Sequence, residues 1–298
     1  MRVFLTGATG FIGSAIVQEL ISAGHQVLGL ARSDAGAKSL AAAGAEVHRG
    51  DLEDLDSLRS GVAAADGVIH TGFIHDFSRF KEVSEIDRRA IEALGGALAG
   101  SDRPIVIASG TALVSPGRLA TEESVSTITS ADIPRIATEE ATTLMATRGV
   151  RAALMRLSPS VHGDGDHGFV PTLINIAREK GVSAYIGDGR NRWNAVHRLD
   201  AARLFRLALE KATAGAKYHA VAEEGIAFRE IAEVIGRRLN IPVVSKSPEE
   251  AANHFGWIGA FAGLDCPASS KLTQERLDWR PAQPTLLTDL ERGSYFKT

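Results

Sequence analysis

Three glycines near the N-terminus have the spacing of a phosphate-binding turn. They lie in the segment Thr6-Gly7-Ala8-Thr9-Gly10-Phe11-Ile12-Gly13, after a short apolar run and before an amphipathic one. Gly7 would let the chain turn off a strand, Gly10 would let backbone approach a ligand, and Gly13 would let helix and strand pack closely. The N-terminus of the following helix offers free N–H groups to an anion. The pattern predicts a site for the pyrophosphate of a nicotinamide dinucleotide.

The residues about 20 positions further on decide between the two dinucleotides, because an acidic residue there would bind the ribose 2′-hydroxyl of NAD. This chain has Arg32 and Ser33 at that place, and Asp34 comes two residues late. A guanidinium matches a 2′-phosphate, and a serine hydroxyl can donate a further hydrogen bond. We therefore expect NADP, with NAD as the alternative; a solvated surface arginine is the simpler reading of Arg32.

Short apolar runs alternate with longer helix-like runs along the first half of the chain. The runs that read as strands are Val3–Thr6, Gln26–Leu30, Ala45–His48, Gly67–His70, Pro104–Ala108 and Arg151–Leu157. The runs that read as helices are Ser14–Ala23, Ala35–Ala43, Leu55–Ala64, Arg79–Ala99 and Arg135–Arg148. This order predicts an α/β fold of the Rossmann type, a doubly wound parallel sheet with helices on both faces.

The alternation loosens after about residue 158. Helix-like runs remain at Val170–Lys180, Ala201–Lys211 and Phe228–Leu239, separated by loops that contain glycine and proline. We expect a dinucleotide-binding core at residues 1–158. Residues 159–298 should form mainly a smaller C-terminal substrate lobe, with segments such as Tyr218–Val221 returning to the core.

The composition is that of an ordinary globular protein. Of 298 residues, 44% are hydrophobic and 23% charged, and the net charge is −3. The absence of a basic run argues against nucleic acid and anionic membranes, and no run of about 20 apolar residues occurs. The single cysteine, Cys266, cannot form an intrachain disulfide. We expect a cytoplasmic protein that binds a small-molecule substrate.

Further segments give a family resemblance that covers nearly the whole chain. They are Gly50-Asp51-Leu52, His70-Thr71-Gly72, the run from Arg156 to Gly163, the run from Gly187 to Asp200, and Leu277-Asp278-Trp279-Arg280-Pro281. Together with the glycine turn, these segments resemble the extended and atypical short-chain dehydrogenases/reductases in their order along the chain. That family includes NAD-dependent epimerases and dehydratases and 3β-hydroxysteroid dehydrogenase-like proteins.

The resemblance implies a cofactor site and a homodimer. The cofactor residues that it and the glycine pattern indicate are Thr6, Gly7, Thr9, Gly10, Phe11, Ile12, Gly13, Arg32, Ser33, Asp51, Leu52, Thr71, Gly72, Ser109, Pro159 and Val161. The dimer would form through the runs Arg79–Ala99 and Arg135–Arg148. Small residues on those runs, such as Ala90 and Ala141, would permit close approach.

The family's usual acid–base pair, Tyr-x-x-x-Lys, is missing. Arg135 stands where the resemblance requires the tyrosine, and Glu139 where it requires the lysine. An arginine scarcely deprotonates, so we expect that these two residues are not an acid–base pair. The family's catalytic hydroxyl matches best at Thr111, with Ser109 as the neighbouring alternative.

A histidine would have to replace the tyrosine as the proton donor, because imidazole titrates in the useful range. The candidates are His162, in the segment that would face the nicotinamide, and His197, in the substrate lobe. A structural role is the more ordinary one for either. The segment from His162 to His167 lacks the spacing of a zinc site, so we expect no metal there.

Three residues of the C-terminal half are candidates for substrate binding. Arg192 could grip an anionic or sugar-like substrate, Trp193 could form a flat wall, and Tyr185 could enter the same site. The alternative is a loop and strand edge packed within the lobe.

Two functions agree with the sequence. The first is an NAD(P)-dependent oxidoreductase, or an epimerase or dehydratase relative, that acts on a small carbonyl, alcohol or sugar-like substrate with a non-standard acid. The second is a non-catalytic NADP-binding sensor or partner module. The missing Tyr-x-x-x-Lys favours the sensor, whereas the hydroxyls after the fifth strand and the elaborate lobe favour the enzyme, which we expect.

Overall fold

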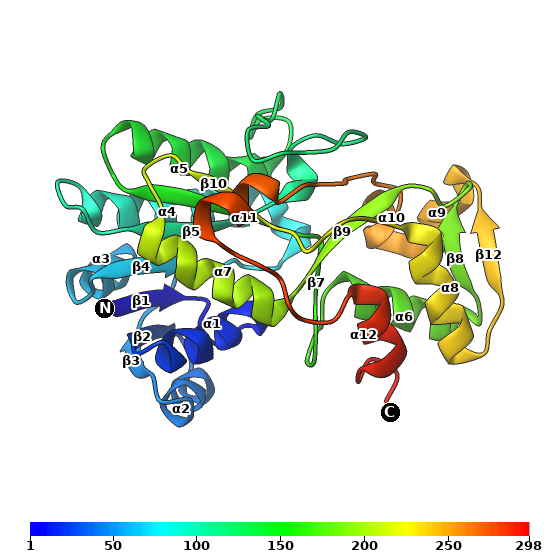
Figure 1. The fold of residues 1–298 in the computed structure, drawn as a ribbon, viewed down its shortest axis with the longest axis horizontal. Coiled ribbons are helices and arrows are strands. Elements are labelled where there is room, and N and C mark those ends of the chain that lie inside the picture. The colour runs from blue at the N-terminus through cyan, green and yellow to red at the C-terminus, as the bar shows by residue number, and fades with distance from the viewer. Residues whose placement is uncertain (298) are drawn as a thin grey trace.

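A seven-stranded parallel sheet forms the centre of the computed structural model, which describes residues 1–297 (Figure 1). Its strand order is β10-β6-β5-β4-β1-β2-β3. The strands are β1 (Arg2–Thr6), β2 (Gln26–Ala31), β3 (Glu46–Arg49), β4 (Gly67–His70), β5 (Ile105–Gly110), β6 (Ala152–Leu157) and β10 (Lys217–Ala220). In the central register, Val3 lies between Val27 of β2 and Gly67 of β4. The expected doubly wound α/β fold is confirmed.

Helices cover both faces of this sheet. One face carries α1 (Phe11–Ser22), α2 (Asp34–Ala42), α7 (Arg198–Lys211) and α11 (Lys271–Leu277). The other carries α3 (Leu55–Ala63), α4 (Phe80–Leu98) and α5 (Ala137–Thr147). Short 3₁₀ turns lie at η1 (Phe77–Arg79), η2 (Thr111–Leu113) and η3 (Pro134–Ile136).

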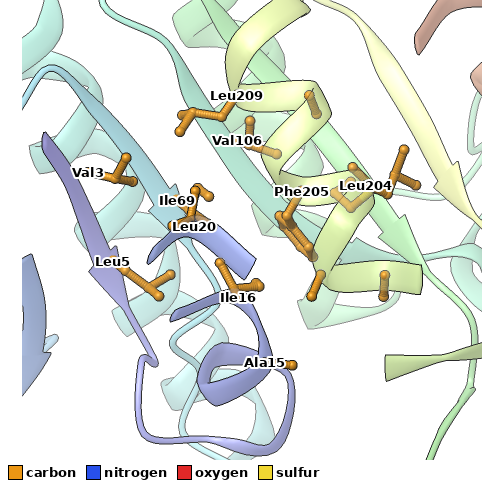
Figure 2. Close-up of a cluster of buried hydrophobic side chains, with 14 of the residues drawn as sticks. Val3, Leu5, Ala15, Ile16, Leu20, Ile69, Val106, Leu204, Phe205 and Leu209 are labelled. Atoms are coloured by element: carbon orange, nitrogen blue, oxygen red, sulfur yellow. The ribbon is translucent and has the colours of Figure 1, made fainter. Parts of the chain in front are cut away.

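The alternation of side chains along β1 supplies both cores. Val3 and Leu5 point to the face of α1 and α7, whereas Phe4 points to the face of α3 and α4. Figure 2 shows Val3 and Leu5 in one cluster with Ile16 of α1 and Phe205 of α7. A sheet covered on both faces explains why its strands read as continuous apolar runs.

Beyond β6 the chain builds a separate layer of helices around two small sheets. The three-stranded sheet contains β7 (Ser160–His162), β9 (Arg192–His197) and β11 (Glu223–Ala227), and the two-stranded sheet contains β8 (Ser183–Ile186) and β12 (Val243–Lys246). The helices are α6 (Phe169–Lys180), α8 (Phe228–Leu239), α9 (Pro248–Phe255), η4 (Gly256–Ile258), α10 (Gly259–Ala262) and α12 (Leu286–Arg292). None of the helices described within residues 1–297 is long and apolar enough to span a bilayer.

Strand β9 and helix α7 form one of the segments by which the chain passes between the lobe and the sheet. Strand β9 belongs to the lobe and runs directly into α7, which packs on the central sheet beside α1 (Figure 1). The end of β9 and the start of α7, at His197 and Arg198, therefore lie where the lobe meets the carboxyl edge of the sheet.

Helices α4 and α5 pack against each other within one chain. Ala90, Ala93, Gly95, Ala137 and Ala141 are all buried within the chain. A Cβ on Gly95 would lie only 1.7 Å from the Met145 sulfur. The suggestion that these small residues permit close approach of a second copy is therefore wrong, because they are already covered within one chain.

Candidate active site

The glycine turn lies between β1 and α1 at the carboxyl edge of the sheet. The structure requires glycine at its three glycine positions to different degrees. Gly7 has φ of +69°, and a Cβ there would lie 2.7 Å from the Gly72 nitrogen. A Cβ on Gly13 would lie 2.0 Å from the Gly7 oxygen. Gly10 has an ordinary extended conformation, and a Cβ there would meet a single atom within 4 Å, the Gly7 oxygen, in a tight contact of 3.2 Å. The fold itself therefore requires Gly7 and Gly13, whereas Gly10 leaves open space at the helix N-terminus, as a bound pyrophosphate needs.

The hydroxyl of Thr6 lies beneath this turn. It forms a 2.7 Å hydrogen bond with Nδ1 of His70 and accepts one of 3.2 Å from the Gly72 N–H. Thr6, a predicted cofactor residue, is fully buried, so its hydroxyl has no exposed surface for a ligand. The residue instead ties the ends of β1 and β4 together and so shapes the turn.

The other predicted cofactor residues lie around the same edge. Arg32 follows β2, is exposed, and makes no hydrogen bond or ion pair with the described residues 1–297. Ser33 is the N-cap of α2, where its hydroxyl accepts from the Gly36 N–H at 3.1 Å. The remaining predicted cofactor residues near this edge are half-exposed or exposed: Thr9, Phe11, Ile12, Asp51, Leu52, Thr71, Gly72, Pro159 and Val161.

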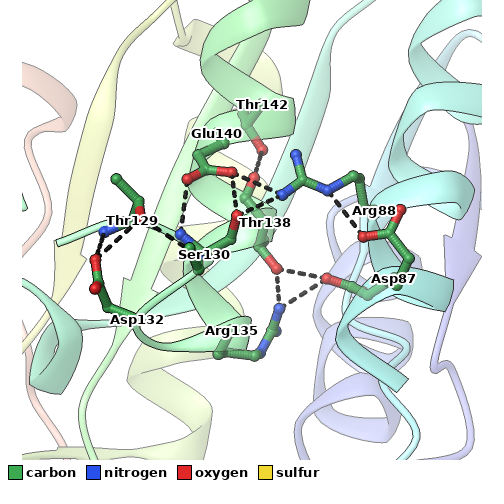
Figure 3. Close-up of polar contacts among 11 residues, drawn as sticks. Asp87, Arg88, Thr129, Ser130, Asp132, Arg135, Thr138, Glu140 and Thr142 are labelled. Carbon is green, nitrogen blue, oxygen red and sulfur yellow. Dashed lines mark hydrogen bonds and ion pairs between the residues drawn. The ribbon is translucent and has the colours of Figure 1, made fainter. Parts of the chain in front are cut away.

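Arg135, at the position of the missing tyrosine, is held by a buried carboxylate (Figure 3). Its Nη1 donates to Oδ2 of Asp87 at 2.7 Å, and Asp87 is only 1% exposed. Burial alone would raise the pKa of Asp87. The charge of Arg135, the charge and hydrogen bond of His70 and the hydrogen bond of Thr138 outweigh burial, so the pKa lies below its ordinary value. The carboxylate also accepts from Thr138 at 2.5 Å and pairs with His70 at 3.0 Å.

The guanidinium of Arg135 is also stacked on an aromatic ring. Its central carbon lies 4.1 Å from the centre of the Phe73 ring, in the loop after β4. The side chain remains 18% exposed. A hydrogen-bond donor with a fixed charge thus lies near the carboxyl ends of β4 and β5.

Glu139, at the position of the missing lysine, forms a two-pronged ion pair with Arg156 of β6. Both oxygens of Glu139 accept from Arg156 at 2.8 Å, and Oε1 also accepts from the Ser109 hydroxyl at 3.1 Å. Arg156 is completely buried. Ser109, a predicted catalytic and cofactor residue, therefore donates its hydroxyl hydrogen bond to Glu139 in this structure.

Thr111, the other predicted catalytic hydroxyl, is 2% exposed. It lies 3.2 Å from the Leu157 carbonyl oxygen and 3.1 Å from the side-chain oxygen of Asn194. These buried contacts join the end of β5 to β9 of the lobe. The hydroxyl thus has internal partners on two sides.

The two predicted histidines lie side by side at the junction of β7, β9 and α7, with ring centres 5.3 Å apart. His162 is fully buried and its Nδ1 lies 2.9 Å from a carboxylate oxygen of Asp289. His197 caps α7, because its Nδ1 accepts from the Leu199 N–H. Burial and the charge of His162 hold the pKa of His197 below its ordinary value. The structure corrects the expectation for His162, which has no exposed atoms for a substrate to reach.

The three predicted substrate residues are not brought together at the cofactor edge. Trp193 is completely buried in the lobe core, where it contacts Phe169 and Phe228, so its prediction as a substrate wall is wrong. Arg192 begins β9 and pairs with Asp265 at 2.9 Å. His197 lies five positions further along the strand, about 17 Å away. Tyr185 lies on β8, at the end of the lobe far from β1 (Figure 1).

The structure brings two other histidines to the site, which the sequence interpretation missed. His75 is exposed on the loop after β4 and lies edge-on to Phe73, with ring centres 5.3 Å apart. Partial burial and the positive charges of Arg135 and His167 lower the pKa of His75. His167 is exposed on the loop of residues 163–168 and meets the Phe11 ring. No periodicity marks these residues, because both belong to loops.

Within residues 1–297, no group of three or more histidine, cysteine, aspartate or glutamate side chains is placed to hold a metal ion.

Comparison with known proteins agrees with this geometry. The model of the NAD dependent epimerase/dehydratase family matches residues 3–222. This chain belongs to that family. An uncharacterised protein of Schizosaccharomyces pombe is 57% identical over 99% of this chain and 100% of its own length.

Relatives with named activities are more distant. The 2-alkyl-3-oxoalkanoate reductase of Stenotrophomonas maltophilia is 29% identical over 83% of this chain and 78% of its own. The crystal structure of the dTDP-glucose 4,6-dehydratase of Streptomyces venezuelae, with NAD and TYD bound, has a TM-score of 0.78 at 20% identity. It covers 99% of this chain and 96% of that one. The fold is therefore that of an NAD-dependent family, and the open space at Gly10 fits such a cofactor.

Proposed function

We propose that the chain is an NADP-dependent oxidoreductase that acts on a small carbonyl, alcohol or sugar-like substrate. Residues 1–158 supply most of the cofactor site, and residues 159–298 mainly form the lobe beside it. In this proposal the turn from Gly7 to Gly13 binds the pyrophosphate and the unpaired Arg32 binds the 2′-phosphate. The protein is proposed to act as a homodimer that pairs through α4 and α5.

The anchored guanidinium of Arg135 carries the proposal of catalysis. Asp87 is fully buried, and its ion pair with Arg135 fixes a charged donor at the position of the family's tyrosine. A charge-assisted hydrogen bond from Arg135 would orient the substrate oxygen and stabilise negative charge that develops on it. The guanidinium does not move the proton, because it scarcely deprotonates.

His75 is proposed to move the proton. When bound, the nicotinamide supplies or accepts a hydride at the substrate carbon. In reduction, the imidazolium of His75 would protonate the substrate oxygen; in oxidation, the neutral imidazole would accept the hydroxyl proton. The lowered pKa of His75 favours the neutral form at pH 7, which suits oxidation of an alcohol.

A non-catalytic cofactor sensor is the second candidate, and one observation favours it. The hydroxyls of Ser109 and Thr111 both have buried partners, Glu139 in one case and Asn194 in the other. A sensor would need the cofactor turn and Arg32 but would not need an exposed proton donor.

The test is steady-state oxidation and reduction of a panel of small alcohols, aldehydes and ketones, followed by the absorbance of the reduced cofactor. Arg135→Gln should lower kcat by about 10²–10³-fold, as loss of an oxyanion donor does. His75→Gln should lower kcat by about 10²–10⁴-fold and remove one limb of the pH profile. Arg88→Gln is the matched control, because Arg88 pairs with Glu140 in the neighbouring network at 2.7 Å (Figure 3).

The outcomes separate the two functions. Full activity of both Arg135→Gln and His75→Gln would refute the mechanism. Tight NADP binding with no turnover of any substrate would favour the sensor. Failure to bind either dinucleotide would refute both.

A further inference from the structure

Helices α1 and α7 lie side by side and run in the same direction. The first residues of the two helices meet, because the guanidinium carbon of Arg198 lies 4.9 Å from the centre of the Phe11 ring. Eight residues further along each helix, Arg206 donates to Glu19 at 2.7 Å. The helices therefore begin together at the carboxyl edge of the sheet.

Two helix N-termini of this kind concentrate positive potential at one place. Each carries partial positive charge from its peptide dipoles. Gly10 stands at the N-cap of α1 and has no side chain with which to occupy the N–H groups. On α7, the His197 side chain caps the Leu199 N–H. Arg198 adds a full positive charge at the tip of α7.

The charge of Arg198 is not neutralised by a partner. Its Nη1 donates to the backbone oxygen of Asp164 at 2.7 Å, and no carboxylate pairs with it in the described part of the chain. His167, from the same loop as Asp164, also contacts Phe11, with ring centres 5.8 Å apart. Arg198 and His167 thus both lie against the residue that follows Gly10.

The loop that carries these contacts is fastened to the C-terminal segment. The Ser294 hydroxyl donates to Asp164 at 2.6 Å, and the Tyr295 hydroxyl donates to Asp166 at 2.8 Å. The Gly163 N–H donates to the same Tyr295 oxygen at 3.1 Å. These bonds hold the loop and Arg198 in one arrangement before any ligand binds.

We propose that Arg198 is a cofactor-binding residue at the tip of α7, which binds the pyrophosphate beside the glycine turn. The proposal rests on the proposed dinucleotide site. It explains why an arginine with no carboxylate partner stands at the tip of α7 beside Phe11. The pyrophosphate would then be held by N–H groups of α1 and by the guanidinium of Arg198, with His167 at the rim.

The experiment compares two ligands by titration calorimetry: NADP⁺, which has the pyrophosphate, and adenosine 2′-monophosphate, which lacks it. Arg198→Gln should weaken NADP⁺ by about tenfold to a hundredfold, the usual loss of a hydrogen bond to a charged group. It should leave the affinity for adenosine 2′-monophosphate unchanged and reduce the salt dependence of NADP⁺ binding. Arg198→Lys should retain most of the affinity, because it keeps the charge.

Arg203→Gln is the control, because it removes the same charge five residues further along α7, away from the tip of the helix. Thermal melts show whether each variant folds. Equal NADP⁺ affinity in Arg198→Gln and the wild type would overturn the proposal. So would a matching loss for adenosine 2′-monophosphate, or equal losses in Arg198→Lys and Arg198→Gln. If the wild-type protein binds neither ligand, the proposed dinucleotide site itself is wrong.

Discussion

His219 should make the stability of this protein depend steeply on pH. It is fully buried on β10, with Nδ1 2.8 Å from the Ser269 carbonyl oxygen and Nε2 3.3 Å from Nη1 of Arg156. In the neutral ring, Nδ1–H donates to the carbonyl and Nε2 accepts from the guanidinium. A second proton on the ring would face the positive charge of Arg156. Burial and this charge lower the pKa of His219 to about 4.

The size of this effect on the free energy of unfolding follows from the difference in the pKa of His219 between the folded and unfolded states. The unfolded chain binds a proton at the ordinary pKa near 6.5, whereas the folded protein binds it only near 4. Above pH 6.5 neither state binds the proton, so the contribution to stability is complete; as pH falls toward 4, the unfolded state alone is stabilised. Each pH unit in this window costs about 1.4 kcal/mol, so His219 should remove about 3 kcal/mol by pH 4.

The assay is urea unfolding of the wild type and His219→Gln between pH 7 and pH 4. Glutamine keeps a hydrogen-bond donor and an acceptor but does not titrate. Protonation of the aspartate and glutamate side chains changes the stability of both proteins alike. The variant should be less stable than the wild type at pH 7, and the gap should close by about 3 kcal/mol at pH 4. Parallel loss of stability in the two proteins would refute the reasoning. Because Arg156 also holds Glu139, protonation of His219 should disturb the ion pair next to the active site.

Three further predictions concern the cofactor and the assembly. Gly10→Glu should abolish dinucleotide binding while the protein stays folded, because φ at Gly10 is −78° and a Cβ there would meet only the Gly7 oxygen; calorimetry showing undiminished NADP affinity would contradict the site. Arg32→Asp should weaken NADP by about 2–4 kcal/mol and NAD far less, and equal losses for both would show that Arg32 does not discriminate. A homodimer through α4 and α5 would have to use their outer, mainly polar side chains, so Arg89→Glu should weaken it; a monomer mass for the wild type in solution scattering at micromolar concentration would exclude the dimer.

The order of strands and helices in the first half could be read from the sequence because it depends on local patterns. The apolar runs of β1, β4 and β5 are continuous since helices cover both faces of the sheet. The glycine turn could also be predicted from the sequence, because backbone geometry fixes the spacing of its glycines. The sequence places the start of this helix at Ser14, but α1 begins at Phe11. Its N-cap is Gly10, which has no side chain to cap the helix, so the usual N-cap residue that would mark the start is missing.

The sequence also showed what is missing, because Arg135 and Glu139 stand where the family has tyrosine and lysine. It could not show that each has a buried partner of opposite charge. Asp87 lies 48 residues from Arg135, and the pair forms only when α4 packs against α5. Arg156 reaches Glu139 because β6 lies beside β5 beneath α5.

Among the site residues predicted in the C-terminal half, some proved wrong because the sequence does not show whether a side chain is exposed. His162 and Trp193 have residue types that suit chemistry and binding, but the lobe buries both completely. His75 lies in a loop without periodicity, and it contacts Phe73, whose ring packs under Arg135. Local sequence determined the sheet and the cofactor turn, whose geometry depends on neighbours along the chain. The tertiary structure alone decided which polar side chains are neutralised inside and which remain for a substrate, because that depends on contacts between distant segments.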